Sequence, residues 1–245
     1  MRITVLLGQY PPDEAAVRRE AVIRCARATT DIEFVDLATT FYKKQGGALA
    51  AALAAPEICR AAVEAERNGS DAVVVFGSLD AGVEAANHLV DIPVVGSGRV
   101  GYHFAAMLGH RIASVVYTES SISYARSLIM RYGLENRVVS VRSLGIALTD
   151  LSEAAQTGEL LQSLSEVGRN AVDHDGADVL FPQGVSMVPI HCDAGTLSRS
   201  VGIPVVDGLA AGIRTAEFFV DTEVTTSRIA YPSMAWPDDE KLDTE

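Results

Sequence analysis

The chain has 245 residues, of which 48% are hydrophobic and 21% are charged, and its formal net charge at pH 7 is −12. This composition predicts a globular protein of one large domain or two ordinary ones, and the acidic balance argues against a nucleic-acid partner. No apolar run approaches the ~20 residues of a membrane-spanning helix, so we expect no membrane partner. The first residues do not have the pattern of a signal peptide.

Three scattered cysteines, Cys25, Cys59 and Cys192, have neither the spacing of a zinc site nor that of a disulfide framework. We therefore expect a reduced, cytoplasmic protein without a metal ion. Gly96-Ser97-Gly98 is too short to be a dinucleotide or phosphate-binding signature, so we also expect no cofactor. We interpret this glycine-rich stretch as a hinge between two parts of the chain.

In the first part of the chain, strand-like apolar runs alternate with helical patterns. A helix predicted over residues 13–27 carries Arg18, Arg19 and Arg24 on its polar face. An alanine-rich helix that follows is predicted to break or restart at Pro56. The other predicted elements are strands at 2–7, 32–35, 72–76 and 93–95 and a helix at 81–89.

The second part repeats this alternation, which predicts an α/β fold with parallel sheets. The last stretch, residues 227–245, is rich in acids and prolines and is expected to form a surface tail or arm. The other elements expected here are helices at 100–108, 152–173 and 208–219, a helix ending at Arg131, and strands at 112–117, 138–141, within 176–184 and at 203–206.

One sequence pattern occurs twice. Gly-Ser-Asp-Ala-Val-Val-Val-Phe-Gly at 69–77 recurs as Gly-Ala-Asp-Val-Leu-Phe-Pro-Gln-Gly at 176–184, and Ile-Pro-Val-Val follows at 92–95 and again at 203–206. Such self-similarity indicates a duplication. We therefore predict two similar α/β halves related by a pseudo-twofold axis, residues 1–97 plus 208–245 and residues 98–207.

Each repeated run reads as a buried strand that ends at a glycine, Gly77 or Gly184. Ligands of open α/β sheets bind outside the carboxyl ends of the strands. If the two halves face each other, both glycines border one active-site cleft. The alternative is that the glycines serve only tight turns after the strands.

These segments resemble the aspartate/glutamate/hydantoin racemase superfamily, with hydantoin and allantoin racemases nearest in character, over the chain up to about Val220. The resemblance implies the α/β fold with two similar halves. Members of the superfamily commonly form homo-oligomers, so we expect a homo-oligomer here. It rests on the residues 71–76, 80–82, 92–96, 176–178, 184–187, 202–208 and 210–211.

The chain departs from the superfamily at the two strand ends. The resemblance implies one cysteine at each end, one removing and the other returning the α-proton of the substrate. The corresponding positions here are Gly77 and Gly184, and Cys192 lies too far along the chain to replace either. The two-thiol racemisation is therefore not expected.

Three residues are candidate proton donors or acceptors. Asp80 follows the first strand end by three residues and is either a general base or the N-cap of the next helix. Glu119 either acts in catalysis or pairs with the dipole of a first helical turn. His191 has a side chain suited to proton transfer near neutrality, or it is a helix-start or surface histidine.

Backbone amides and hydroxyl groups at the strand ends are expected to hold the substrate. Tyr42 and Lys43 form either a lid over the cleft or a solvated turn. Ser78 or Ser186, activated by His191, would give a hydrolase, although no nucleophile-elbow motif surrounds either serine. The predicted substrate-binding residues are Gln9, Tyr10, Tyr42, Gly77, Ser78, Thr118, Ser120, Gly184, Val185 and Ser186.

The main hypothesis is a cofactor-independent enzyme for a small anionic substrate or a cyclic amide or imide. It would hold an enolate or oxyanion in the cleft and perform lyase, decarboxylase, ring-opening or isomerase chemistry without thiols. One alternative is a racemase-type isomerase for hydantoins or amino acids that uses non-cysteine acids and bases. The other is a protein that binds a small acid without turnover.

Overall fold

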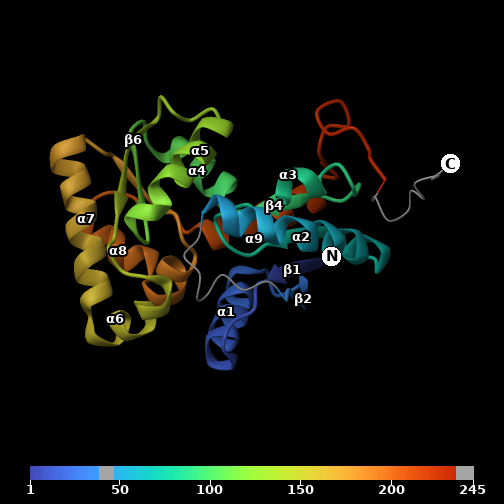
Figure 1. The fold of residues 1–245 in the computed structure, drawn as a ribbon, viewed down its shortest axis with the longest axis horizontal. Coiled ribbons are helices and arrows are strands. Elements are labelled where there is room, and N and C mark those ends of the chain that lie inside the picture. The colour runs from blue at the N-terminus through green and yellow to red at the C-terminus, as the bar shows by residue number, and fades with distance from the viewer. Residues whose placement is uncertain (39–46, 236–245) are drawn as a thin grey trace.

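The computed structural model describes residues 1–38 and 47–235, and within these it contains two parallel sheets (Figure 1). The first has the order β2-β1-β3-β4 and the second the order β6-β5-β7. All strand pairs in both sheets are parallel, which confirms the predicted α/β fold with two parallel-sheet halves. The strands are β1 (Arg2–Leu7), β2 (Asp31–Asp36), β3 (Ala72–Val75), β4 (Val94–Gly96), β5 (Ile112–Val116), β6 (Val138–Ser143) and β7 (Val179–Pro182).

The sheet order shows the duplication that the sequence suggests. In each half the first strand is central, with the second strand on one side and the glycine-terminated strand, β3 or β7, on the other. Leu180 of β7 also forms a single parallel bridge with Val205, in the place that β4 takes beside β3. The two Ile-Pro-Val-Val segments therefore have equivalent positions.

Helices cover both faces of the first sheet at β3, which is apolar and buried at every position. Val73 and Val75 pack against α2, whereas Val74 packs on the opposite face with α9. Alternate side chains of a strand point to opposite faces, which explains this division. The α-helices are α1 (Pro12–Cys25), α2 (Ala48–Arg67), α3 (Val83–Ala86), α4 (Ser97–Leu108), α5 (Ile122–Arg131), α6 (Leu151–Thr157), α7 (Glu159–Asp175), α8 (Ala194–Val201) and α9 (Gly208–Asp221).

The chain returns to the first half at its end. Leu209, Ile213 and Ala216 of α9 share a core cluster with Val5 of β1 and Val74 of β3. Figure 1 shows α9 beside β4, away from α6 and α7 of the second half. This packing supports the division into 1–97 plus 208–245 and 98–207, which remains a proposal.

The structure corrects two expectations for local structure. Arg18 is not on a polar face but is fully buried. Helix α2 continues through Pro56 without a break. The 96–98 stretch, for which the hinge stays a prediction, is a direct junction in which β4 ends at Gly96 and α4 begins at Ser97. Residues 225–234 are mostly exposed, in agreement with the expected surface arm, and bind the α3–β4 connection, for example through Arg228 and Asp91.

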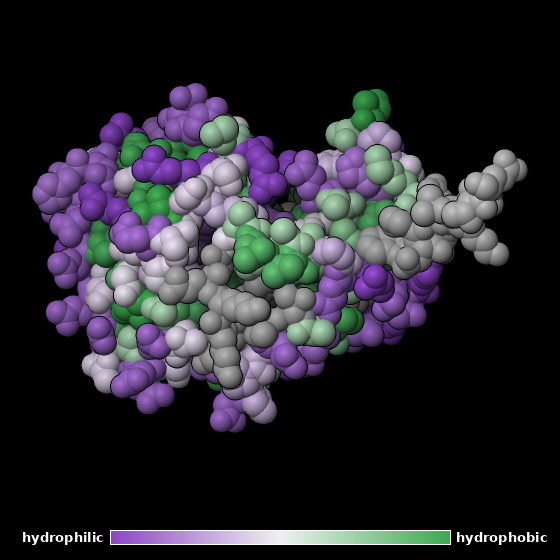
Figure 2. Space-filling model, viewed as in Figure 1, coloured by the Kyte–Doolittle hydropathy of each residue, from purple (hydrophilic) through white to green (hydrophobic). Residues whose placement is uncertain are grey.

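The outer surface is uneven in character. Figure 2 shows mostly hydrophilic side chains over α6 and α7 and a hydrophobic area over α2, where Leu49 and Leu53 are exposed. Among the described residues, no helix combines the length and the apolar character that crossing a membrane requires.

Candidate active site

A cavity of about 90 Å³ lies where the carboxyl ends of the two sheets meet. Its wall is built from residues that follow four central strands, so one site collects the ends of both halves. Gly77 and Gly184 both belong to this wall, as the repeated pattern predicts. The wall residues next to strand ends are Gly8 and Tyr10 after β1, Gly77 and Ser78 after β3, Tyr117 and Thr118 after β5, and Gly184, Val185 and Ser186 after β7.

The structure favours glycine at the two equivalent positions for different reasons, the backbone conformation at Gly77 and the lack of space at Gly184. Gly77 has φ +112°, a conformation that favours glycine, but a Cβ built there meets nothing within 4 Å. A Cβ at Gly184 would collide with the Tyr117 hydroxyl group and would lie 2.5 Å from its Cζ. At the second strand end the space beside the backbone is therefore already filled by a phenol.

Buried hydrogen bonds fix the spacing between the two strand ends. The Gln183 side chain donates to the backbone carbonyl of Ser78 at 3.2 Å and accepts from the Tyr102 hydroxyl at 2.9 Å. Tyr124 of α5 donates to the carbonyl of Leu79 at 3.2 Å. The hydrogen bonds from Gln183 to Ser78 and from Tyr124 to Leu79 join the two halves, so they hold the cavity walls at a set distance.

Ser78 presents an unpaired hydroxyl group at this site. The residue is 5% exposed, and its Oγ has no hydrogen-bond partner among the described residues. A buried polar atom left without a partner costs about 1–3 kcal/mol. A ligand with an acceptor atom in the cavity would remove that cost.

Asp80 lies in the cavity wall, but its carboxylate is occupied. It accepts hydrogen bonds from the backbone N–H groups of Gly98 at 2.9 Å and Arg99 at 2.6 Å, and from the Tyr132 hydroxyl at 2.6 Å. It does not cap α3, as one alternative held, but α4. Burial raises the pKa of Asp80, while these hydrogen bonds act to lower it. The contacts favour a positioning role, and catalysis by Asp80 stays a prediction.

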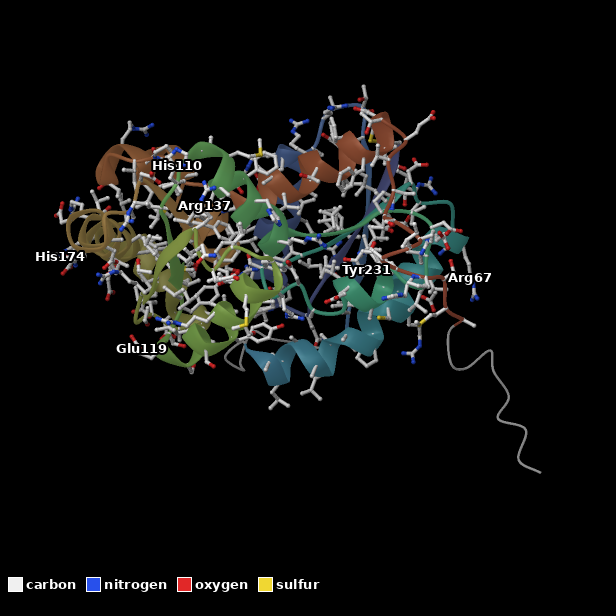
Figure 3. The ribbon with its side chains drawn as sticks, turned by 90° about the horizontal axis from the view of Figure 1, so that it is seen from above. Arg67, His110, Glu119, Arg137, His174 and Tyr231 are labelled. Carbon is white, nitrogen blue, oxygen red and sulfur yellow. The ribbon has the colours of Figure 1, made fainter. Side chains whose placement is uncertain are left out.

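The other two candidate acids or bases lie outside the cavity wall. Glu119 is exposed in the short 3₁₀ helix η1 (Glu119–Ser121), and Figure 3 shows it at the outer edge of the second half. His191 ends the π-helical turn η3 (Ser186–His191), with its Nε2 3.5 Å from Oε2 of Glu14. Burial lowers the pKa of His191, although Glu14 opposes this shift.

The structure brings most of the predicted substrate-binding residues together. Tyr10, Gly77, Ser78, Thr118, Gly184, Val185 and Ser186 line the cavity. Gln9 and Ser120 lie outside its wall, and Ser121 takes the place expected for Ser120. Tyr42 and the lid suggested with Lys43 lie outside the described residues.

A buried arginine behind the second strand end was not anticipated. Arg18 of α1 is 0% exposed, forms an ion pair with Glu14 and donates from Nη2 to Ser186 Oγ at 2.9 Å. Its guanidinium also lies over the ring of Tyr10, 4.1 Å from the centroid. Nothing in the local sequence distinguishes Arg18 from its exposed neighbours on α1. Tyr117 was also missed, although its place at the end of an apolar run could have indicated a strand-end residue.

The three cysteines lie away from the cavity wall. Burial raises the pKa of Cys25 and of Cys192 to about 11, and it also raises the pKa of Cys59. None of the three belongs to the cavity wall as described. Within residues 1–38 and 47–235, no group of three or more His, Cys, Asp or Glu side chains could hold a metal ion.

Comparison with known proteins gives consistent results. The family described as Asp/Glu/Hydantoin racemase matches residues 16–216. A hydantoin racemase from Rhizobium meliloti is 27% identical over 216 residues, 87% of either chain. One from Pseudomonas sp. (strain NS671) is 29% identical over 177 residues, 72% of this chain and 69% of the relative. The allantoin racemase structure from Pseudomonas fluorescens superposes with a TM-score of 0.87 at 24% identity, over 99% of each chain, and so shows the fold.

Proposed function

Because this chain belongs to the Asp/Glu/hydantoin racemase family, we propose that it is a racemase-type isomerase acting on a small cyclic amide of the hydantoin kind. The observation that carries the proposal is that two equivalent strand ends, at Gly77 and Gly184, line one cavity. A racemase must reach one carbon atom from both faces, and a duplicated fold provides this arrangement. The names of the hydantoin racemase relatives support the substrate class.

Racemisation at a carbon next to a carbonyl group passes through an enolate, so the site must stabilise this anion. A base on one side of the ring, for which Asp80 is the candidate in the cavity wall, would take the proton next to a ring carbonyl and leave a planar enolate. Return of a proton from water or an acid on the opposite face then inverts the centre. Preorganised hydrogen-bond donors aimed at the developing charge supply much of the catalysis in such reactions. The hydroxyl groups of Ser78 and Thr118 and the strand-end backbone are suited to this task.

A second candidate follows from the glycines at both strand ends. Without a thiol at either position, the same anion-holding site could serve a lyase, a decarboxylase or a ring-opening enzyme, or could bind a small acid without turnover.

Homo-oligomer formation and a cytoplasmic location also remain proposals.

The test is to incubate enantiopure 5-substituted hydantoins and allantoin with the protein in D₂O. We expect loss of the circular-dichroism signal together with incorporation of one deuterium at the stereocentre, faster than in buffer alone. Ser78→Ala should slow the exchange, whereas Ser152→Ala on α6 serves as the matched control. A product of different mass would favour the second candidate, and tight binding without exchange would favour a binding protein.

A further inference from the structure

We propose that Arg18, Ser186 and Tyr117 form a buried donor chain that gives the second half of the cavity a preference for a planar anion. This inference rests on the proposed function and extends it to residues that touch or support the substrate. Tyr117 would contact the ligand directly, and Arg18 and Ser186 would act as positioning residues behind it.

The first step concerns the position of the Tyr117 hydroxyl group. Tyr117 directly follows β5, lines the cavity and places its Oη where a side chain at Gly184 would begin. The group that the second strand end offers to a ligand is therefore the phenol of Tyr117. Its counterpart on the first half is the unpaired hydroxyl of Ser78.

The second step concerns what stands behind the phenol. Ser186 and Tyr117 line the same wall of the cavity, and the nearness of Ser186 acts to lower the pKa of the Tyr117 phenol. The Ser186 hydroxyl accepts a hydrogen bond from Arg18 Nη2 at 2.9 Å. The Ser186 hydroxyl can therefore take a hydrogen bond from the cation and pass its own hydrogen on toward a phenol. Tyr10 lies against the same guanidinium and also contacts Ser186.

The third step concerns the charge. Glu14 compensates Arg18 at Nη1, so the ion pair presents its positive end to Ser186. Burying an arginine completely is costly even when it is paired, and its Nε has no partner among the described residues. The Arg18–Glu14 pair is therefore not a surface salt bridge. Its guanidinium directs positive charge toward Ser186 at the second strand end.

The fourth step concerns the protonation state. Burial raises the pKa of Tyr117 far above its ordinary value, and the hydrogen bonds from Ser186 and the charge of Arg18 only partly oppose this. The phenol is therefore protonated at neutral pH and donates a hydrogen bond. With Ser78 opposite, two neutral hydroxyl groups face the cavity, an arrangement suited to an enolate-like monoanion of ring size.

Two probes of nearly equal shape separate charge from fit: pyrrole-2-carboxylate, a planar anion, and pyrrole-2-carboxamide, its neutral analogue. Calorimetry on the full chain should show that the parent binds the carboxylate more tightly. Tyr117→Phe should weaken carboxylate binding by about tenfold or more, because hydrogen bonds to charged groups are among the strongest, and should change amide binding by less than about twofold. Tyr231→Phe is the matched control, since Tyr231 lies outside the cavity wall and packs against His88.

Ser186→Ala tests the positioning chain and avoids the folding risk of Arg18→Met. It should reduce the carboxylate-to-amide preference, and it should also shrink the further loss of carboxylate binding that Tyr117→Phe causes in the same chain, as a double-mutant cycle measures. A merely structural role for Ser186 would change neither quantity. Equal preferences in the parent, Tyr117→Phe and Ser186→Ala, or no preference in the parent, would overturn the inference. Absence of deuterium exchange by the parent would instead overturn the proposed function, so the two failures can be told apart.

Discussion

The Asp80 carboxylate accepts a hydrogen bond from the Tyr132 hydroxyl, with 2.6 Å between the oxygens, and so joins the loop after β3 to the end of α5. The same carboxylate caps α4 through Gly98 and Arg99. A Cβ at Gly98 would lie 2.5 Å from the carbonyl of Ser78, so this close approach needs a glycine. One acid thus ties three segments at the rim of the cavity.

Asp80→Ala should lower the free energy of unfolding by about 2–4 kcal/mol, because it removes a helix cap and a charged acceptor. The positive φ of 49° at this position adds strain for alanine. Tyr132→Phe removes a single donor and should cost clearly less. Denaturant titration of the three proteins measures both values. A cost for Asp80→Ala below that of Tyr132→Phe would contradict the capping role.

Gly184→Ala should lower the free energy of unfolding by about 1–3 kcal/mol through overpacking against Tyr117. In a Tyr117→Ala background the same change should cost clearly less, because only the flexible Met187 methyl group, 2.8 Å from the new Cβ, would still have to move. A double-mutant cycle would detect the difference. Gly77→Ala is the matched control: its Cβ has space, so any cost comes from φ +112° and should not depend on Tyr117. Additive costs for Gly184→Ala and Tyr117→Ala would show that the two sites do not touch.

His191 should make stability depend on pH below neutrality. Because its folded-state pKa is lowered, the unfolded chain binds more protons, and stability falls as pH drops from about 6.5 through the folded value. Glu14 and Arg18 are the charged groups that face it. His191→Gln should flatten this part of the profile.

His103 provides the comparison, since burial and Arg99 lower its pKa as well. His103→Gln should flatten the same range to a smaller or similar degree, and the double variant should do so further. Unfolding measured at several pH values between about 4.5 and 7 tests this. An unchanged slope in His191→Gln would show that His191 titrates alike in both states.

Arg228 should hold residues 225–234 against the first half. It donates to the carbonyl of Asn87 at 2.9 Å and pairs with Asp91 at 2.6 Å. Because Asp91 is largely exposed, the ion pair itself contributes little, and we expect Arg228→Ala to favour local opening by about 1 kcal/mol. Limited proteolysis should then cut this segment about fivefold faster, whereas Arg24→Ala on α1 should leave the rate unchanged.

The sequence by itself determined the layout of the molecule. Repeated runs such as 69–77 and 176–184 predicted buried parallel strands, because apolar segments that end at glycine suit a sheet covered on both faces. The offset between the repeats predicted two halves, and the carboxyl-end rule then placed Gly77 and Gly184 at one cavity. These inferences use only the local pattern of apolar residues and the order of the elements, and both can be read from a single sequence.

Only the tertiary structure decided what each polar side chain does there. Whether Arg18 is a surface residue or a buried partner of Ser186, 168 positions away, depends on how α1 packs against η3. Asp80 could be assigned to α4 rather than α3 only once the fold had brought Gly98 beside it. Long-range hydrogen bonds and burial set these roles, and neither leaves a periodic trace in the sequence. Likewise, only the tertiary structure shows that the Tyr117 phenol fills the space that a side chain at position 184 would occupy.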